Sequence, residues 1–285
     1  MNFASKSLIA AAAFVAATGS AQAITNTLTA GGSVTDAGWT LDQLQGSGTL
    51  SFSSLLISAL NTAAVSLGEV SPATLSITTS TNSVGVRRFV SASAAAPIAS
   101  LTGSFDGEIL TVEKVGTSGG ATQTTIKNSA TTGPGFLSIS NLNVDLTTKT
   151  VFADIEGANG VGKISQYALW SYNNITGPTT FAVPDPAVQT VFTSENTITG
   201  LFASQATIDD IFVKGLALGS VGKSGLTAVN DPTKGGGAGF GTIVSKITVI
   251  ATPNVVTPAI PEPSTYALMG LGLVGIGLVA RRRAN

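Results

Sequence analysis

The side chains of this sequence that could do chemistry are carboxylates and hydroxyls, because the 285-residue chain contains no histidine and no cysteine. Without histidine there is no side chain that normally titrates near neutral pH, and Ser-His-Asp catalysis and histidine-ligated metals are excluded. Without cysteine there are no disulfides, thiolate nucleophiles or thiolate-ligated zinc and iron–sulfur sites. Paired carboxylates, Ser-Lys pairs and calcium, which binds oxygen ligands, remain possible.

Acidic residues stand two positions apart at two places, Asp106 with Glu108 and Asp154 with Glu156. In a β-strand both members of such a pair point to the same face of the sheet. Asp154 and Glu156 are therefore weak candidates for calcium ligands, although no segment has the spacing of a known calcium loop. Solvent-exposed carboxylates explain both pairs more simply. A hydrolase with two catalytic carboxylates is the least favoured function.

Two glycine-rich segments and one aromatic cluster are candidate ligand sites. Segment 219–224 contains Gly-Lys-Ser, but a phosphate-binding loop of the Walker type needs glycine where this chain has Ala217. Segment 235–241 lacks dinucleotide-binding spacing and is predicted to be a flexible loop. We therefore predict no cofactor. Aromatic residues of the predicted strand 163–172 could stack on sugars, although such residues more often pack in a core: Tyr167, Trp170 and Tyr172.

The composition restricts the partners of the protein. Hydrophobic residues make up 43% of the chain and charged residues only 10%, against about 25% charged residues in an average domain. Residues 24–259 include ten basic and fourteen acidic side chains, a net charge of −4. Nucleic-acid binding needs a positive field that displaces counterions from phosphates, so this partner is excluded. A weakly charged surface rich in hydroxyl groups suits contact with exopolysaccharide.

Residues 24–250 are predicted to form a mainly β domain, an antiparallel β-sandwich-like fold with one or two short helices. Apolar residues recur every three or four positions from Ser54 to Leu67 and again from Ser204 to Leu218, which is the period of an amphipathic helix. Short alternating runs bounded by Gly, Pro and Ser predict strands elsewhere. The polar segment 123–128 is predicted to be a mobile loop.

The clearest strand signal is a β-hairpin, in which two alternating runs flank a turn of four residues. The runs supply two matching core faces: Leu142, Val144 and Leu146 before the turn, and Val151, Ala153 and Ile155 after it. The apolar residues that precede Leu142 are out of phase with it. This change of phase predicts a β-bulge near Ser140 and Asn141.

Residues 1–23 have the pattern of a cleavable signal peptide. The pattern consists, in order, of a basic residue, an apolar run and two small residues before the cleavage site: Lys6, 8–17, and Ala21 with Ala23. The apolar run is too short to be a stable membrane anchor. We therefore predict export through the Sec translocon, with Ile24 as the mature N-terminus.

The C-terminal segment 260–285 follows a proline-containing linker, 251–259, and has three parts. These are Pro261-Glu262-Pro263, an apolar run of 15 residues from Tyr266 to Ala280, and Arg281-Arg282-Arg283. As a helix the apolar run would span roughly 22 Å, less than the ~30 Å hydrocarbon core of a bilayer. The arginines would stay in the cytoplasm by the positive-inside rule. The tail is thus predicted to be a single, thin transmembrane helix with the body on the outer side of the inner membrane.

This tail resembles the PEP-CTERM sorting signal in the order and the terminal position of its parts. The resemblance covers about a tenth of the chain and extends to Pro261, Glu262, Pro263 and the arginine cluster. It implies recognition by an integral-membrane exosortase, cleavage near the motif, and delivery to the cell surface or extracellular matrix of a Gram-negative bacterium. The bodies of such proteins are diverse, so the resemblance implies no activity for residues 24–259.

We therefore predict a non-enzymatic, exported structural or interaction protein of the cell surface or biofilm matrix. Its predicted partners are the Sec translocon, an exosortase and exopolysaccharide, with transient anchoring in the inner membrane. A carbohydrate- or calcium-binding module of the matrix is the alternative.

Overall fold

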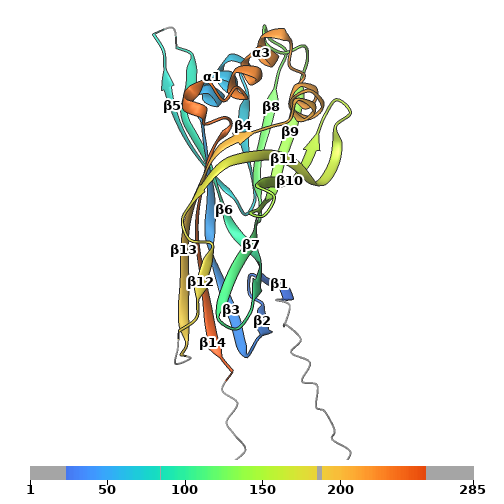
Figure 1. The fold of residues 1–285 in the computed structure, drawn as a ribbon. Helices are drawn as coiled ribbons and strands as arrows, with labels where there is room; N and C mark the ends of the chain where they lie inside the picture. The colour runs from blue at the N-terminus through green and yellow to red at the C-terminus, as the bar shows by residue number, and fades with distance from the viewer. Residues whose placement is uncertain (1–23, 84, 185–187, 255–285) are drawn as a thin grey trace, which may run out of the picture.

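A computed structural model of the chain describes residues 24–83, 85–184 and 188–254. In these ranges the chain forms one antiparallel sheet of 14 strands with a few short helices (Figure 1). The predicted mainly β, antiparallel class is confirmed. The strands are β1 (Ile24–Thr29), β2 (Ser33–Asp36), β3 (Trp39–Phe52), β4 (Ser66–Val70), β5 (Thr74–Thr81), β6 (Arg87–Phe105), β7 (Ile109–Thr117), β8 (Gly120–Thr125), β9 (Gly135–Asp145), β10 (Thr150–Gly157), β11 (Gly162–Thr176), β12 (Thr180–Ala182), β13 (Thr190–Phe202) and β14 (Gly241–Pro253).

The sheet curls until two of its strands meet a second time. Its main path runs β12-β7-β6-β3-β14-β13-β11-β10-β9-β8-β4, and β7 also pairs with β9. That additional pairing joins Lys114 with Asp145, Val115 with Val144, and Gly116 with Asn143. It closes the strands from β7 through β9 into a ring, which we call the strand ring. The sequence predicted a sandwich-like arrangement, whereas the structure has a single continuous sheet that closes on itself.

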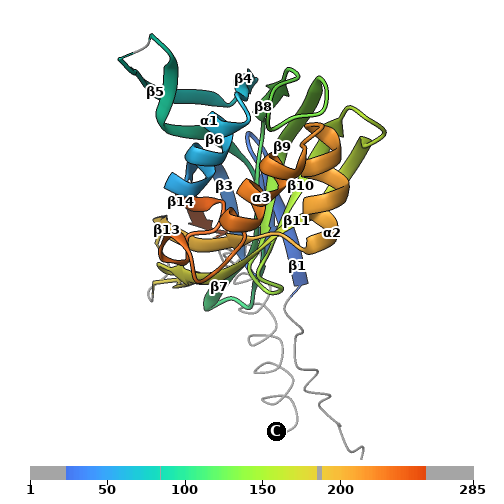
Figure 2. The same cartoon turned by 90° about the horizontal axis from the view of Figure 1, so that it is seen from above.

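The interior of the strand ring holds two clusters of buried apolar residues. One cluster lies at the end where the helices are and includes Leu137, Val151 and Leu201. The other lies at the opposite end, where the ring of Trp39 meets the ring of Phe105 edge-on at 6.5 Å. The helices α1 (Ser54–Thr62), α2 (Gln205–Thr207), η1 (Ile208–Val213) and α3 (Ser220–Val229) cover the first end (Figure 2). We call these helices the helical cap.

The first predicted helix is shorter than the sequence pattern indicated. Ser53 caps α1, its hydroxyl accepting from the Leu56 amide at 3.1 Å. The helix ends at Thr62, and Ala64 adopts a left-handed conformation with φ 49°. Leu67, which fits the helical period, instead lies in β4 and pairs with Gln123 of β8. The long-range pairing of β4 with β8 thus overrides the local period.

The segment predicted to be a mobile loop is strand up to Thr125 and a loop only beyond that residue, so the prediction places the start of the loop too early. Residues up to Thr125 belong to β8, which pairs with both β4 and β9. Beyond the strand, the Asn128 side-chain amide donates to the Ala63 carbonyl at the end of α1, at 2.8 Å. The hydrogen bonds that a polar segment would make with water are made here with two strands and a helix end.

The second predicted helix begins where the sequence placed it, and a third helix was missed. Ser204 caps α2, accepting from the Thr207 amide at 3.0 Å. The following turns of η1 are wound as a π-helix, and helical structure ends at Gly215. After a short connection, Gly219 begins α3. Two glycines inside α3, Gly222 and Gly225, weaken the helix signal of its sequence.

The predicted hairpin and its bulge are both confirmed. β9 and β10 pair around the expected turn, and the inward residues of β10 are almost inaccessible: Val151 0%, Ala153 0% and Ile155 2% exposed. Val144 is buried in β9, and Leu142 and Leu146 pack against the same cluster. The register shifts opposite Asp154, where Asn141 has φ 51°.

Both ends of the described body lie at the end opposite the helical cap (Figure 1). Ile24, the first residue after the predicted cleavage site, pairs with Phe105. At the other terminus β14 continues through Pro253, which pairs with Trp39, so the strand includes the first three residues of the predicted linker. The body therefore begins and ends at one pole, which we call the terminal pole.

Candidate functional site

The chain leaves the folded body through a well-anchored segment at the terminal pole. The Asn254 amide donates to the Gly38 carbonyl at 2.7 Å, and its side-chain oxygen accepts from the Thr40 hydroxyl at 2.9 Å. Asn254 is the last described residue. The backbone is thus held in register with β3 up to the point from which the C-terminal tail extends.

The predicted sorting and processing residues lie outside the described residues. They are Pro261, Glu262 and Pro263, the orienting arginines Arg281, Arg282 and Arg283, and the cleavage-site residues Ala21 and Ala23. The predicted transmembrane run, Tyr266–Ala280, also falls there. Within the part of the chain that the structure describes, no helix is long and apolar enough to cross a membrane.

Asp154, one of the two calcium candidates, holds two bulges of the sheet together. One carboxylate oxygen accepts from the Asn141 amide side chain at 2.9 Å, and the other accepts from the Gln166 backbone amide at 2.8 Å. Asn141 and Gln166 both have positive φ, 51° and 48°. Burial acts to raise the pKa of Asp154, but these hydrogen bonds outweigh it, and the pKa lies below its ordinary value.

Glu156, the second candidate, is engaged elsewhere. Its carboxylate forms an exposed ion pair with Lys163 at 3.1 Å on the neighbouring strand. Among the described residues there is no group of three or more acidic side chains that could hold a metal ion. The arrangement around Asp154 and Glu156 therefore has a structural explanation in each case.

Asp145 is the buried acidic residue of the described chain, at 4% exposed. One oxygen accepts from the backbone amides of Thr147 and Thr148, both at 2.9 Å, and the other lies 3.0 Å from the Lys114 ammonium. Burial acts to raise the pKa of Asp145, yet the hydrogen bonds from Thr147, Thr148 and Lys114 hold it far below the usual range. This carboxylate stays ionised and fully engaged in holding the β9–β10 turn and the closure of the strand ring.

The aromatic residues that could have stacked on sugars pack in the core, which is the alternative that the sequence favoured. Trp170 and Tyr172 are each 4% exposed, and the Tyr167 hydroxyl lies 3.1 Å from the Thr207 hydroxyl. Burial raises the pKa of Tyr172, and the nearby Asp145 carboxylate adds to the rise. Trp170 and Tyr172 lie on the same face of β11, and a register shift between Ala168 and Trp170 lets Tyr167 pack against the same cluster.

The Gly-Lys-Ser segment forms the first turns of α3, and packing explains its glycine and lysine. A Cβ on Gly222 would lie 2.6 Å from the Ala130 carbonyl oxygen, so α3 approaches that backbone closely. The Lys223 ammonium lies 2.6 Å from the Asp209 carboxylate of η1. No parallel strand precedes this segment in the described chain, and the sequence conclusion against a phosphate loop agrees with the geometry.

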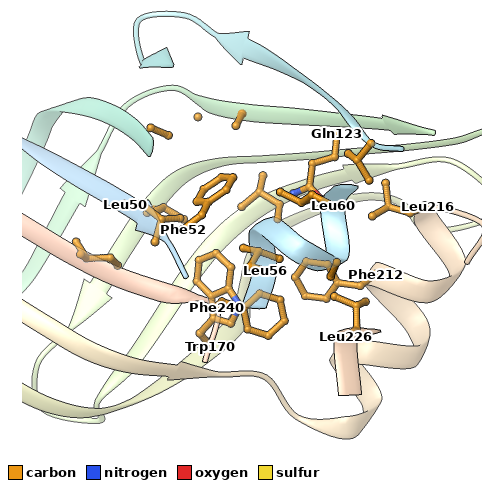
Figure 3. Close-up of a pocket in the computed structure, with 18 of the residues that line it drawn as sticks. Leu50, Phe52, Leu56, Leu60, Gln123, Trp170, Phe212, Leu216, Leu226 and Phe240 are labelled. Atoms are coloured by element: carbon orange, nitrogen blue, oxygen red, sulfur yellow. The ribbon is translucent and has the colours of Figure 1, made fainter. Parts of the chain in front are cut away.

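A feature that the sequence did not indicate is an apolar cavity of about 80 Å³ beneath the helical cap. Its walls come from α1, η1, α3 and the inner face of the sheet, and aromatic rings line one side (Figure 3). Phe240 lies between two of them, with ring centres 5.6 Å from Trp170 and 5.0 Å from Phe212. No charged side chain lines it. Such a cavity forms from residues remote in sequence, and a single sequence carries no signal for it.

Comparison with known protein families bears on the tail. Residues 259–283 match the family model described as the PEP-CTERM protein-sorting motif. The tail is a PEP-CTERM sorting motif. The match includes Pro261-Glu262-Pro263 and the three arginines, the residues on which the sequence resemblance was based. The PEP-CTERM motif begins five residues after Asn254, the last described residue at the terminal pole.

The comparisons give no information on the function of the body that precedes the PEP-CTERM motif. No curated protein and no solved structure gave a significant match to the chain. The PEP-CTERM motif implies export to the cell envelope or surface, and what the body does there has to be argued from its own geometry.

Proposed function

We propose that an exosortase recognises and cleaves the PEP-CTERM tail, and that the released body serves as a non-enzymatic structural or interaction protein. Its destination is the cell surface or biofilm matrix of a Gram-negative bacterium. The observation that carries this proposal is the match of residues 259–283 to the sorting motif. Initial export through the Sec translocon, with cleavage after Ala23, belongs to the same proposal.

The layout of the body supports removal of the tail after folding. The last residue of the buried clusters is Ala251, and β14 ends at Pro253. Glu262 stands eight residues beyond Asn254. Cleavage near Glu262 would therefore leave both buried clusters and all described strands intact. While the tail holds the protein at the membrane, the helical cap lies at the pole farthest from the attachment point.

Cell fractionation with mass spectrometry tests the sorting step. Wild type is expected at the surface or in the medium with a mass that lacks the tail. Glu262→Ala is expected to remain in the inner membrane at full length after signal-peptide removal. Glu108→Ala, which removes an exposed carboxylate of the body, is the matched control and should behave as wild type. If wild type and Glu262→Ala both stay full-length in the membrane, the tail is an ordinary anchor.

An interaction role for the body is supported by a hairpin that projects beside the helical cap (Figure 1). This arm consists of β5 and residues 87–95 of β6. It exposes apolar side chains: Ile77 is 37%, Val86 49% and Val90 57% accessible. Where the two strands are joined, the Val86 amide donates to the Asn82 side-chain oxygen at 2.8 Å. A preorganised arm with exposed apolar residues suits contact with a partner.

The outer edge of the arm favours a second copy of this chain as that partner. β5 pairs only with β6 among the described strands, and Thr74–Thr81 contains no charged residue and no proline. Charges and prolines are what usually protect an edge strand from pairing with another chain. Glu69 covers one edge donor, the Leu75 amide, at 2.7 Å. We propose that two copies pair through β5, edge to edge, in an antiparallel manner.

Sedimentation velocity measures this association. Wild type is expected to dimerise, and Thr78→Lys, which places a charge on the edge of β5, to be monomeric. The control Val244→Lys places the same charge at an exposed site of β14, at a residue that is paired on both sides. It should dimerise as wild type does. A monomeric wild type, or a Thr78→Lys variant that still dimerises, would refute pairing through β5.

A further inference from the structure

The outer face of the sheet carries two rows of mostly polar, uncharged side chains that cross six neighbouring strands, β5, β6, β3, β14, β13 and β11. The registers between these strands bring one residue of each strand into each row. The first row, in strand order, is Ser76, Ser93, Ser51, Thr242, Thr199 and Asn174. The second row is Thr74, Ala95, Thr49, Val244, Thr197 and Thr176. We call the two rows the hydroxyl face.

The side chains of the hydroxyl face point away from the core. The strand residues that lie between the two rows line the interior instead, among them Ile243 and Ile198. In the first row Ser76, Ser51 and Asn174 are exposed, and the other three residues are half-buried. Within the described chain, none of the five hydroxyl groups of this row has a hydrogen-bond partner. These hydroxyls are therefore available to another molecule.

The chemistry of the hydroxyl face limits the partner that it fits. It contains no charged and no aromatic residue, and the charges next to it, Glu195 and Lys246, neutralise each other in an ion pair at 2.7 Å. Nucleic acid and anionic lipid need basic side chains. Protein interfaces depend on buried aromatic residues and arginine. An uncharged polymer that itself carries many hydroxyl groups needs neither.

The spacing of the rows matches a chain of sugar units. Neighbouring strands lie about 4.8 Å apart, so a row that crosses six strands is ~24 Å long and has one side chain per strand. This repeat is close to the length of one sugar unit in an extended, equatorially linked polysaccharide. The sheet also twists by about 20–25° from one strand to the next. A flat crystalline surface would therefore meet only a few strands, whereas a single flexible chain can follow a whole row.

We propose that the hydroxyl face binds one chain of an extended, uncharged polysaccharide, which crosses the strands along the two rows. The serine and threonine hydroxyls exchange hydrogen bonds with sugar hydroxyls, and Asn174 supplies an amide at the β11 end. Val244, which is 46% exposed, and Ala95 give an apolar surface for the C–H face of a sugar ring. This inference names a partner for the proposed interaction role, and it rests on that role only for the place where the two meet.

NMR titration of the full chain with cello-oligosaccharides tests the site. Each exposed hydrogen bond replaces one made with water, so a single contact contributes little and affinity must grow with the number of sugar units. Cellohexaose is expected to shift the backbone amide signals of Ser51, Thr242 and Thr199, and to bind about tenfold or more tightly than cellobiose. No shift at the solubility limit, shifts confined to other strands, or tighter binding of the galacturonic acid hexamer would overturn the inference.

Two sets of variants separate the hydroxyl groups from the shape of the surface. The triple variant Ser51→Ala, Thr242→Val, Thr199→Val removes three hydroxyls, and valine keeps the strand propensity of threonine. It is expected to bind cellohexaose about tenfold more weakly, the sum of three small contributions. The double variant Thr242→Ser, Thr199→Ser keeps the hydroxyls and should bind within about twofold of wild type. Equal losses in both sets would mean that the hydroxyls are not what the sugar contacts.

The matched control removes two hydroxyls from a strand outside the hydroxyl face. Thr122 and Thr124 lie on β8, which pairs with β4 and β9, and Thr122→Val, Thr124→Val should bind as wild type does. If the triple variant also binds as wild type, the hydroxyl face is not the site. Thr78→Lys should still bind cellohexaose, because Thr78 lies outside both rows. A failure of pairing through β5 and a failure of sugar binding are therefore separate results.

Discussion

Lys114 and Asp145 form an ion pair at the seam that closes the strand ring, with 3.0 Å between the ammonium nitrogen and the carboxylate oxygen. The two residues are also direct partners in the short pairing of β7 with β9. Because Asp145 accepts from Thr147 and Thr148 as well, one carboxylate fixes both the closure of the ring and the β9–β10 turn. Its removal affects two long-range features at once.

Replacement of Asp145 by asparagine is therefore expected to be strongly destabilising. The variant loses the ion pair and leaves a buried site with mismatched donors, which costs about 2–4 kcal/mol of unfolding free energy. Urea unfolding at pH 7 measures this change. Glu156→Gln, which breaks the exposed pair with Lys163, is the control and should change stability by no more than about 0.5 kcal/mol. Equal losses of unfolding free energy in the two variants would show that the Lys114–Asp145 pair contributes no more to stability than an exposed ion pair.

The same carboxylate predicts how stability depends on pH. Because the pKa of Asp145 is far lower in the folded protein than in an unfolded chain, the unfolded state binds its proton more readily. The resulting stabilisation is complete above about pH 5 and is lost as pH falls through the ordinary Asp value of about 3.9 and below it. Wild type should therefore lose more unfolding free energy than Asp145→Asn between pH 5 and pH 3. Parallel curves for the two proteins would contradict the assignment.

Substitutions at two glycines of α3 test the effect of close packing and the effect of helix propensity separately. At Gly222 an added Cβ would lie 2.6 Å from the Ala130 carbonyl oxygen, whereas at Gly225 the nearest atom would be 3.5 Å away. Gly222→Ala should cost about 1–3 kcal/mol by overpacking. Gly225→Ala should be neutral or stabilise by up to about 1 kcal/mol, because alanine favours a helix. Thermal unfolding of both variants makes the comparison, and a stabilising Gly222→Ala would show that the backbone gives way there.

The features that the sequence predicted are those specified by local patterns. The hairpin of β9 and β10 was predicted because alternation on both sides of a turn is a short-range signal, and the bulge at Asn141 because a phase change shows where the alternation breaks. Ser204 was predicted as a cap for the same reason, since its partner is only three residues away. Each of these signals lies within about fifteen residues of sequence.

The features that were missed depend on contacts between distant segments. The end of α1 is set by the pairing of β4 with β8, more than fifty residues further along the chain. The closure by Lys114 and Asp145 and the cavity beneath the helical cap arise from segments that no local pattern joins. The candidate calcium ligands show the same limit. Their spacing was read correctly as a strand pair, but Asp154 is occupied by Gln166 and Asn141, which lie on two other strands.

Because the carboxylates of Asp154 and Glu156 already have partners in the protein, we predict that calcium does not stabilise it. Asp154 uses both carboxylate oxygens on the bulges at Asn141 and Gln166, and Glu156 is paired with Lys163. A calcium ion, which needs six or more oxygen ligands, would have to break these contacts to bind. The melting temperature of wild type should therefore be the same in millimolar calcium and in EDTA.

Asp154→Ala separates the structural role from a metal-binding role. The variant should lose about 1–2 kcal/mol of unfolding free energy, because two backbone bulges in left-handed conformations lose their common acceptor. The loss should be equal with and without calcium. Wild type that gains stability in calcium while Asp154→Ala does not would instead make Asp154 a ligand, and the bulge contacts would then be those of the metal-free state.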